Sequence, residues 1–214
     1  MRLVLPRLYV ILDSALLKNS TRDCAQELAA AGVGLLQYRN KSASARELLE
    51  TSRELVSSLE SSRTALIVND RPDVAALAGA KGVHVGQDDL DAEQARAVVG
   101  KEMWVGASTH NLEQFRRAVA TSADYIAVGP IFATTSKANP DPVVGVELIR
   151  EVRALTDKPI VAIGGITLER AEAVIDAGAD SVAVISDILL ARNPGERARQ
   201  YLDVLGETNR AAAV

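Results

Sequence analysis

The sequence predicts an α/β fold, a single compact (β/α)8 TIM barrel, and three observations lead to this prediction. Eight short apolar segments alternate with helical patterns rich in Ala, Leu, Glu and Arg, as in parallel strands joined by helices. The helix ends repeat, because a glycine suited to a left-handed cap closes the first helical segment at Gly32 and the seventh at Gly178. These glycines lie 146 residues apart (178 − 32), so each of six strand–helix units takes about 24 residues and eight units need about 195 of the 214 residues. A doubly wound open sheet is the alternative.

Each strand is expected where a short run rich in Val, Ile and Leu is bounded by polar residues or glycine. In chain order the expected strands are 8–13, 34–39, 65–69, 82–85, 103–108, 125–129, 159–164 and 181–185. Helices are expected between them, with the clearest patterns at 44–60, 111–120 and 168–177. No long polar linker interrupts the series, so residues 1–205 are expected to form one barrel domain and residues 206–214 a tail that frays.

Composition excludes several classes of function. The chain carries 24 Lys and Arg residues against 28 Asp and Glu, a net charge of −4, which gives no general reason to expect binding to nucleic acid or an anionic membrane. The single cysteine, Cys24, excludes an internal disulfide and is expected to be a buried structural thiol in a reducing compartment. No apolar run approaches the ~20 residues of a membrane span, and Pro6 and Arg7 interrupt any export signal. We therefore expect a cytoplasmic protein with small-molecule partners, in an oligomeric state that the sequence leaves open.

In a barrel of this kind the chemistry lies at the C-terminal ends of the strands. After the second strand, Gln37, Arg39 and Lys41 alternate along the chain and share one face while it stays extended, which favours binding of an anion with a polar group attached. A solvated strand end is the alternative interpretation of these residues.

Carboxylates follow the third and fourth strands. Asp70 follows Asn69 at the end of the third strand, and Asp89 ends the segment HVGQDD. On adjacent strands the two carboxylates could face each other, and Mg²⁺ commonly takes one or two carboxylates and leaves its other positions to water and phosphate oxygens. Helix capping is the alternative: Asp70 could cap the helix at Pro72, and one of Asp88 and Asp89 is expected to cap the helix that begins near Ala92.

The fifth strand ends in GASTH, where Ser108 would supply a small hydroxyl donor to a pocket. His110 is either a catalytic acid or base, or, as we expect, a residue that shapes the helix start before Asn111. His84 is expected to be a core histidine with a hydrogen-bond partner.

The segment 129–145 is the longest irregular stretch and carries several hydroxyls and Lys137 between prolines. A lid that closes on a phosphate fits this composition, and a plain exposed loop is the alternative. After the seventh strand, the glycine pair 164–165 would let backbone N–H groups approach a ligand, and Thr167 is expected to be an N-cap. The loops after the seventh and eighth strands are the usual phosphate site of this architecture.

Taken together, these strand ends resemble thiamine-phosphate synthases, a family of (β/α)8 enzymes. The resemblance runs in order through QYRNK, VNDR, GVHVGQDD, GASTHN, GPIFATTSK, IGGIT and VISD, from Tyr9 to about Ser186. It implies the condensation of 4-amino-2-methyl-5-hydroxymethylpyrimidine diphosphate with 4-methyl-5-hydroxyethylthiazole phosphate, with release of diphosphate. It also implies a Mg²⁺ ion and the charge neutralisation that lets diphosphate leave before the thiazole attacks, without a side-chain nucleophile.

By this resemblance, each group of residues has a role. The pyrimidine diphosphate would be held by Gln37, Arg39, Lys41, Asn69, Ser108 and Lys137, with Ser108 and Lys137 acting in catalysis. Asp70 and Asp89 would hold Mg²⁺. The thiazole phosphate would be bound by Thr134, Thr135, Ser136, Gly165, Ile185 and Ser186. The family usually has Pro and Thr where this chain has Ala133 and Ser136; Ser136 keeps the hydroxyl, and Ala133 could leave the loop less rigid.

Two other functions remain. A sister enzyme, a thiazole tautomerase, would need the thiazole half of the site but not the diphosphate and metal residues, which are all present here. A non-catalytic barrel that binds a phosphorylated metabolite would have little use for metal-binding carboxylates. Arg71 is expected to be structural and to hold an acid at the start of the third helix.

Overall fold

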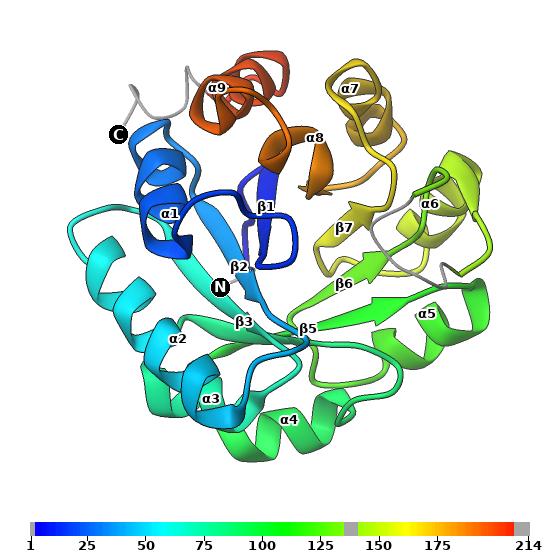
Figure 1. Cartoon of the computed structure of the whole chain (residues 1–214). Coiled ribbons are helices and arrows are strands. Elements are labelled where there is room, and N and C mark those ends of the chain that lie inside the picture. Colours follow the sequence, from blue (N-terminus) through cyan, green and yellow to red (C-terminus); the bar gives the residue numbers. More distant parts are fainter. Residues whose placement is uncertain (1–2, 135–140, 208–214) are drawn as a thin grey trace.

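The computed structural model describes residues 3–134 and 141–207 and forms a closed barrel of eight parallel strands in the order β1 to β8, with helices around it (Figure 1). The strands are β1 Leu8–Asp13, β2 Leu35–Arg39, β3 Ala65–Asn69, β4 Gly82–Val85, β5 Trp104–Thr109, β6 Tyr125–Val128, β7 Ile160–Ile163 and β8 Ser181–Val184. Because β8 pairs with β1, the barrel prediction is confirmed and the open doubly wound sheet is excluded. Every expected strand lies within one residue of its observed bounds.

The helices follow the strands in alternation and lie outside the barrel (Figure 1). They are α1 Thr21–Ala30, α2 Ala45–Leu59, α3 Pro72–Ala78, α4 Ala92–Val99, α5 Leu112–Val119, α6 Gly145–Arg153, α7 Leu168–Asp176, α8 Ser186–Leu189 and α9 Pro194–Val204. The short α8 directly follows β8, and α9 then packs against α1 and α7. No helix in the described part of the chain is long and apolar enough to cross a membrane.

Alternation along the strands divides the apolar side chains into two clusters. One set faces the barrel interior and includes Tyr9, Ile67, Tyr125 and Val161. A larger set on the opposite strand faces packs against the helices. The interior is therefore a filled core, and the cavity lined by the predicted residues lies beyond the C-terminal strand ends.

The helix starts correct one expectation, exclude one alternative and confirm one expectation. Asp91, and neither Asp88 nor Asp89, caps α4, because its side chain accepts from the Gln94 N–H in a reciprocal capping box. Asp70 does not cap α3 either, since Arg71 occupies the N-cap position, and its side chain makes no capping bond. Arg71 does hold an acid, as expected: its guanidinium donates to both oxygens of Asp73, at 2.8 and 2.6 Å.

Three further expectations concern single residues and the tail. Thr167 occupies the N-cap position of α7, but its side chain makes no capping bond there. Cys24 is buried, and burial followed by the charge of Glu27 raises the pKa of its thiol to about 11, as suits a structural cysteine. In the tail, Glu207 accepts from the Arg7 N–H at 2.5 Å, and residues 208–214 lie outside the described residues.

Candidate active site

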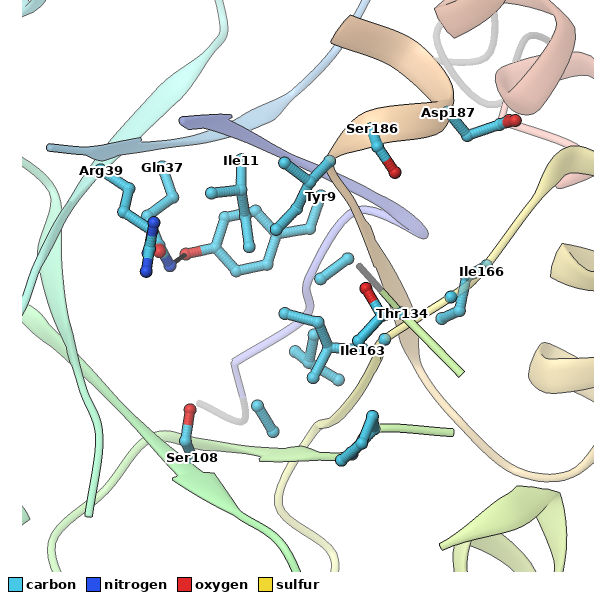
Figure 2. A pocket seen from close by; sticks show the side chains of 18 of the residues that line it. Tyr9, Ile11, Gln37, Arg39, Ser108, Thr134, Ile163, Ile166, Ser186 and Asp187 are labelled. Carbon is cyan, nitrogen blue, oxygen red and sulfur yellow. Dashed lines mark hydrogen bonds between the residues drawn. The ribbon is translucent and has the colours of Figure 1, made fainter. Parts of the chain in front are cut away.

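A cavity of about 490 Å³ opens at the C-terminal ends of the strands. Figure 2 looks into it, with Gln37 and Arg39 of β2 on one wall and Ser186 and Asp187 of α8 on another. Of the residues predicted to bind substrate or act in catalysis, the cavity is lined by Gln37, Arg39, Asn69, Ser108, Thr134, Gly165, Ile185 and Ser186. The structure therefore brings together around one space eight predicted residues, from the ends of β2, β3 and β5 and from the segments that follow β6, β7 and β8.

The β2 wall carries a guanidinium that is held in place by a buried acid. Arg39 donates through Nη1 to Asp13, the last residue of β1, whose side chain is almost fully buried. The other Asp13 oxygen accepts from the Ala15 N–H at 3.1 Å, so both carboxylate oxygens are occupied. Asp13 fixes the direction of the Arg39 side chain, and the remaining guanidinium N–H groups have no partner among the described residues and are available to an anion.

Two carboxylates and an ammonium stand at the rim beyond β3 and β4. Asp70 has a φ of 63°, a left-handed conformation that aspartate tolerates better than most residues, and its side chain accepts from Lys41. Burial raises the pKa of Asp89, and a hydrogen bond with the neighbouring Asp70 carboxyl raises it further. The N–H of Gly86, 2.8 Å from Asp89 Oδ2, and the charge of Lys41 oppose this shift.

This rim fits a divalent cation. Two like charges in contact repel each other, and a cation between them would relieve the repulsion that now raises the pKa of Asp89. Hard oxygen donors of this kind suit Mg²⁺, which needs only one or two protein carboxylates. The described residues contain no group of three or more acids, histidines or cysteines that could hold a metal, so the remaining positions would fall to water and substrate.

The opposite wall, from β6 to β8, contains the glycine pair predicted to let a ligand approach the backbone. Gly164 and Gly165 have φ values of 98° and 62°, and a Cβ at Gly165 would lie 2.3 Å from the carbonyl oxygen of Ala133. The glycine pair thus lets the segment after β6 pack onto the end of β7, where Phe132 N–H donates to Gly164 O at 3.0 Å. Close packing by itself accounts for these glycines, and the approach of a ligand to their N–H groups stays a prediction.

Arg170 stands at the edge of the same wall. Its Nη1 donates to the Gly165 carbonyl at 3.0 Å, and its Cζ lies 4.6 Å from the centre of the Phe132 ring. Asp187 also lines this side, but Arg197 and the Tyr201 hydroxyl, 2.6 Å away, already bind its carboxylate.

The two histidines both line the cavity, and each also has a structural role. His84 is buried as expected, with Nδ1 3.1 Å from the Tyr125 hydroxyl and Nε2 2.8 Å from Ser108 Oγ. His110 precedes the Asn111 cap of α5, as expected, and its Nδ1 donates to the Gly129 carbonyl at 2.7 Å. The His110 Nε2 lies 3.6 Å from Asp141 Oδ2, across the loop that follows β6.

Some predicted residues lie elsewhere. Lys41, Asp70 and Asp89 stand at the rim and do not line the cavity itself. Thr135, Ser136 and Lys137 lie in the middle part of the expected lid, residues 135–140, which is outside the described residues.

Sequence reasoning missed several cavity residues, among them Tyr9, Ile11, Asp141, Arg170 and Asp187, and it missed the positioning acid Asp13. One signal was present: residues 9, 11 and 13 alternate along β1 as 37 and 39 do along β2, so they face the same interior.

Known proteins resemble this chain over most of its length. A family model described as thiamine monophosphate synthase matches residues 8–188. A thiamine-phosphate synthase of Koribacter versatilis (strain Ellin345) is 56% identical over 216 residues, covering 95% of this chain and 97% of that protein. One of Chloroflexus aurantiacus (strain ATCC 29366 / DSM 635 / J-10-fl) is 41% identical over 207 residues, covering 96% of this chain and 95% of that protein.

A solved structure agrees with these sequence matches. The thiamine phosphate pyrophosphorylase from Pyrococcus furiosus has a TM-score of 0.85 at 31% identity, covering 94% of this chain and 96% of that chain. Family model, relatives and structure all span the barrel and the strand ends that surround the cavity, and on these grounds the chain belongs to the thiamine-phosphate synthase family.

Proposed function

We propose that this protein joins 4-amino-2-methyl-5-hydroxymethylpyrimidine diphosphate to 4-methyl-5-hydroxyethylthiazole phosphate and releases diphosphate and thiamine phosphate. The observation that carries this proposal is the division of the cavity into two unlike walls. One wall has Arg39 at the cavity and Lys41, Asp70 and Asp89 at its rim, and the other has backbone groups and short side chains around Gly165. Two phosphorylated substrates of different charge would each find a matching side.

On the charged wall, the task of the protein is to neutralise a departing diphosphate. Asp70 and Asp89 would hold Mg²⁺, which when bound would supply positive charge to the diphosphate oxygens. Arg39 would donate to the same oxygens from a direction fixed by Asp13. Lys41 pairs with Asp70 and would add its charge from the rim, and Lys137 would complete this set from the segment after β6.

On the other wall, the task is to hold the thiazole phosphate and exclude water from the reacting carbon. Thr134, Gly165, Ile185 and Ser186 line this side and would bind the phosphate, with Thr135 and Ser136 contributing from the same segment. Apolar side chains of the floor, such as Ile11 and Ile163, would keep water away from a pyrimidine cation. The thiazole nitrogen must then lie within about 3–3.5 Å of that carbon.

The test is a turnover assay with both substrates that measures thiamine phosphate and diphosphate, with and without Mg²⁺. We expect Mg²⁺-dependent release of one diphosphate for each thiamine phosphate. Isomerisation of a thiazole phosphate without pyrimidine or Mg²⁺ would instead indicate the tautomerase. Binding of either phosphate without product would indicate a non-catalytic binder and overturn the proposal. The single buried thiol of Cys24 is consistent with the cytoplasm, where we expect the enzyme to act.

A further inference from the structure

Five polar side chains form a continuous line of hydrogen bonds beneath the cavity. Gln37 Nε2 lies 2.7 Å from the Tyr9 hydroxyl, which lies 3.2 Å from the Tyr125 hydroxyl. The Tyr125 hydroxyl lies 3.1 Å from His84 Nδ1, and His84 Nε2 lies 2.8 Å from Ser108 Oγ. The five residues come from β2, β1, β6, β4 and β5, so the line crosses the barrel interior, and both of its ends reach the cavity.

The line has a direction, because each hydroxyl carries one hydrogen. The Gln37 amide nitrogen can only donate, so the Tyr9 oxygen accepts from it. The arrangement that satisfies both hydroxyls then directs the Tyr9 hydrogen to the Tyr125 oxygen, its other partner. In the same way, Tyr125 passes its hydrogen on to His84 Nδ1.

The direction continues through the imidazole. Burial lowers the pKa of His84 to about 4, with Asp89 acting weakly in the opposite sense, so the ring is neutral and carries one hydrogen. Because Nδ1 accepts from Tyr125, that hydrogen lies on Nε2 and is donated to Ser108 Oγ. The hydroxyl hydrogen of Ser108 is left for the cavity, and at the other end the Gln37 carbonyl oxygen, which accepts no hydrogen bond from the described residues, is left as an acceptor.

The interior is shaped to hold the central member of this line. A Cβ at Gly106 would lie 2.4 Å from the Tyr125 hydroxyl oxygen and 2.1 Å from its Cζ, so only glycine leaves room for the phenol there. The Tyr125 ring is fully buried, stacks on His84 and meets Tyr9 edge to face. Tyr125 does not line the cavity, so any effect it has on a ligand passes through its neighbours.

We propose that Tyr9, Tyr125 and His84 are positioning residues that fix Ser108 as a hydrogen-bond donor and Gln37 as an acceptor toward the pyrimidine substrate. This inference rests on the proposed function for the identity of the ligand. An aminopyrimidine diphosphate presents both complements: an amino group that donates, and ring nitrogens and phosphate oxygens that accept. If the hydrogen bonds ran in the opposite direction, Ser108 would be an acceptor and Gln37 a donor toward the cavity. Polar groups of the bound pyrimidine would then stay unpaired, which strongly disfavours its complex with the protein.

The direction of the line can be measured without any turnover. The chain has two histidines, and long-range ¹H–¹⁵N correlation spectra of protein with ¹⁵N-labelled histidine show which ring nitrogen carries the hydrogen. We expect His84 to be protonated on Nε2, and His110 on Nδ1, which faces the Gly129 carbonyl. His110→Gln assigns the two signals. A His84 ring protonated on Nδ1 would overturn the proposal.

Steady-state kinetics test whether the direction of these hydrogen bonds affects binding of the pyrimidine diphosphate. Tyr125→Phe removes the oxygen that joins Tyr9 to His84 and is expected to raise KM for the pyrimidine diphosphate about tenfold, with KM for the thiazole phosphate within about twofold. Tyr38→Phe is the matched control, because Tyr38 is equally buried but faces the helices, and its hydroxyl only accepts from Asn40. Equal KM values in the two variants would overturn the proposal.

A second pair of variants guards against a folding defect. Glutamine at position 84 can accept from Tyr125 and donate to Ser108, whereas leucine can do neither. We expect His84→Gln to stay within about threefold of the parent kcat/KM for the pyrimidine diphosphate and His84→Leu to lose at least about tenfold. Equal values in the two variants would contradict the inference. If the parent enzyme itself releases no diphosphate, the proposed function fails, while the tautomer measured by NMR still decides the direction of the line.

Discussion

The two ends of the barrel both place arginine against aspartate, but they use the pair differently. At the N-terminal ends of the strands, Arg153 donates to Asp180 and to the carbonyls of Thr156 and Lys158. Asp180 also accepts from the Ile160 N–H at 2.8 Å. Arg96 and Asp124 repeat the arrangement two units earlier: the guanidinium donates to Asp124 and three carbonyls, and Asp124 accepts from the Val105 N–H at 2.7 Å.

At the mouth, the arginine is left with free donors. Within the part of the chain that the structure describes, the Arg39 side chain donates only to Asp13. Burial does not separate the two ends, because the side chains of Arg39 and Arg153 are 21% and 25% exposed. The two ends differ in how many of the guanidinium N–H groups are bonded to the described residues. This difference indicates that the pairs at the N-terminal ends stabilise the fold, whereas Arg39 at the mouth has donors left to bind a ligand.

The rim carboxylates provide the largest expected effect. Asp70→Asn and Asp89→Asn should each lower kcat/KM by about 10³-fold or more, because the positive charge that balances diphosphate is lost. Asparagine is preferred to alanine at position 70, since it also tolerates the left-handed φ of 63°. The free energy of unfolding should fall little or even rise, because two like charges are no longer in contact.

Asp88→Asn is the control for this prediction, because Asp88 is the exposed neighbour of Asp89 in the sequence. Steady-state kinetics at saturating Mg²⁺ and urea unfolding measure the two quantities. Near-normal turnover in both the Asp70 and the Asp89 variant would contradict the assignment of a metal to this rim.

The buried hydrogen-bonded line in the barrel interior contains His84, which should make the free energy of unfolding depend on pH. His84 has a pKa of about 4 in the folded protein against 6.5 when unfolded, so between these values the unfolded chain binds more protons. The free energy of unfolding should therefore fall by about 3 kcal/mol as pH drops from 6.5 to 4, and this contribution should level off just below pH 4. Urea unfolding across this range, compared with His84→Gln, isolates the effect from that of the carboxylates. A parallel pH dependence in both proteins would count against it.

The arginine pairs themselves should separate stability from catalysis. Arg153→Met leaves Asp180 partly buried without its cation and should lower the free energy of unfolding by about 3 kcal/mol, with kcat/KM per folded molecule unchanged. Arg39→Lys keeps a charge beside Asp13 but removes the forked donors, and it should lower kcat/KM about 10²-fold with little change in stability. Loss of activity in the first variant, or equal loss of stability in both, would remove the distinction between the two ends.

The sequence predicted most of the barrel because most residues of its strands are buried. A continuous apolar run such as 65–69 is typical of a strand in a buried parallel sheet. The spacing of the glycines at helix ends then predicted the number of strand–helix units. The helix caps were harder to predict. Three acids occur in the stretch 88–91, and the choice of Asp91 depends on where the chain leaves β4, although its spacing to Gln94 is that of a capping box.

The candidate site was predictable only where it depends on strand order. Asp70 and Asp89 follow adjacent strands, so their contact could be expected from the sequence. The meeting of Tyr9 with Tyr125 could not, because β1 and β6 are not neighbours and the contact depends on side-chain length and on the missing Cβ at Gly106. Asp13 was overlooked for a similar reason, since its importance comes only from its bond to Arg39.

The smallest expected effect on kinetics concerns the cavity wall from β6 to β8. Arg170 is held at the cavity edge by the Gly165 carbonyl and the Phe132 ring, and its charge faces the side where we expect the thiazole phosphate. Arg170→Met should raise KM for the thiazole phosphate about tenfold at low salt, and the difference should shrink as salt screens this exposed charge. Arg199→Met, exposed on α9 and away from the cavity, is the control. If KM changes equally in both variants, the Arg170 guanidinium does not contact the phosphate. The thiazole phosphate would then be bound on this wall without an arginine, unlike the diphosphate that we expect Arg39 to bind on the β2 wall.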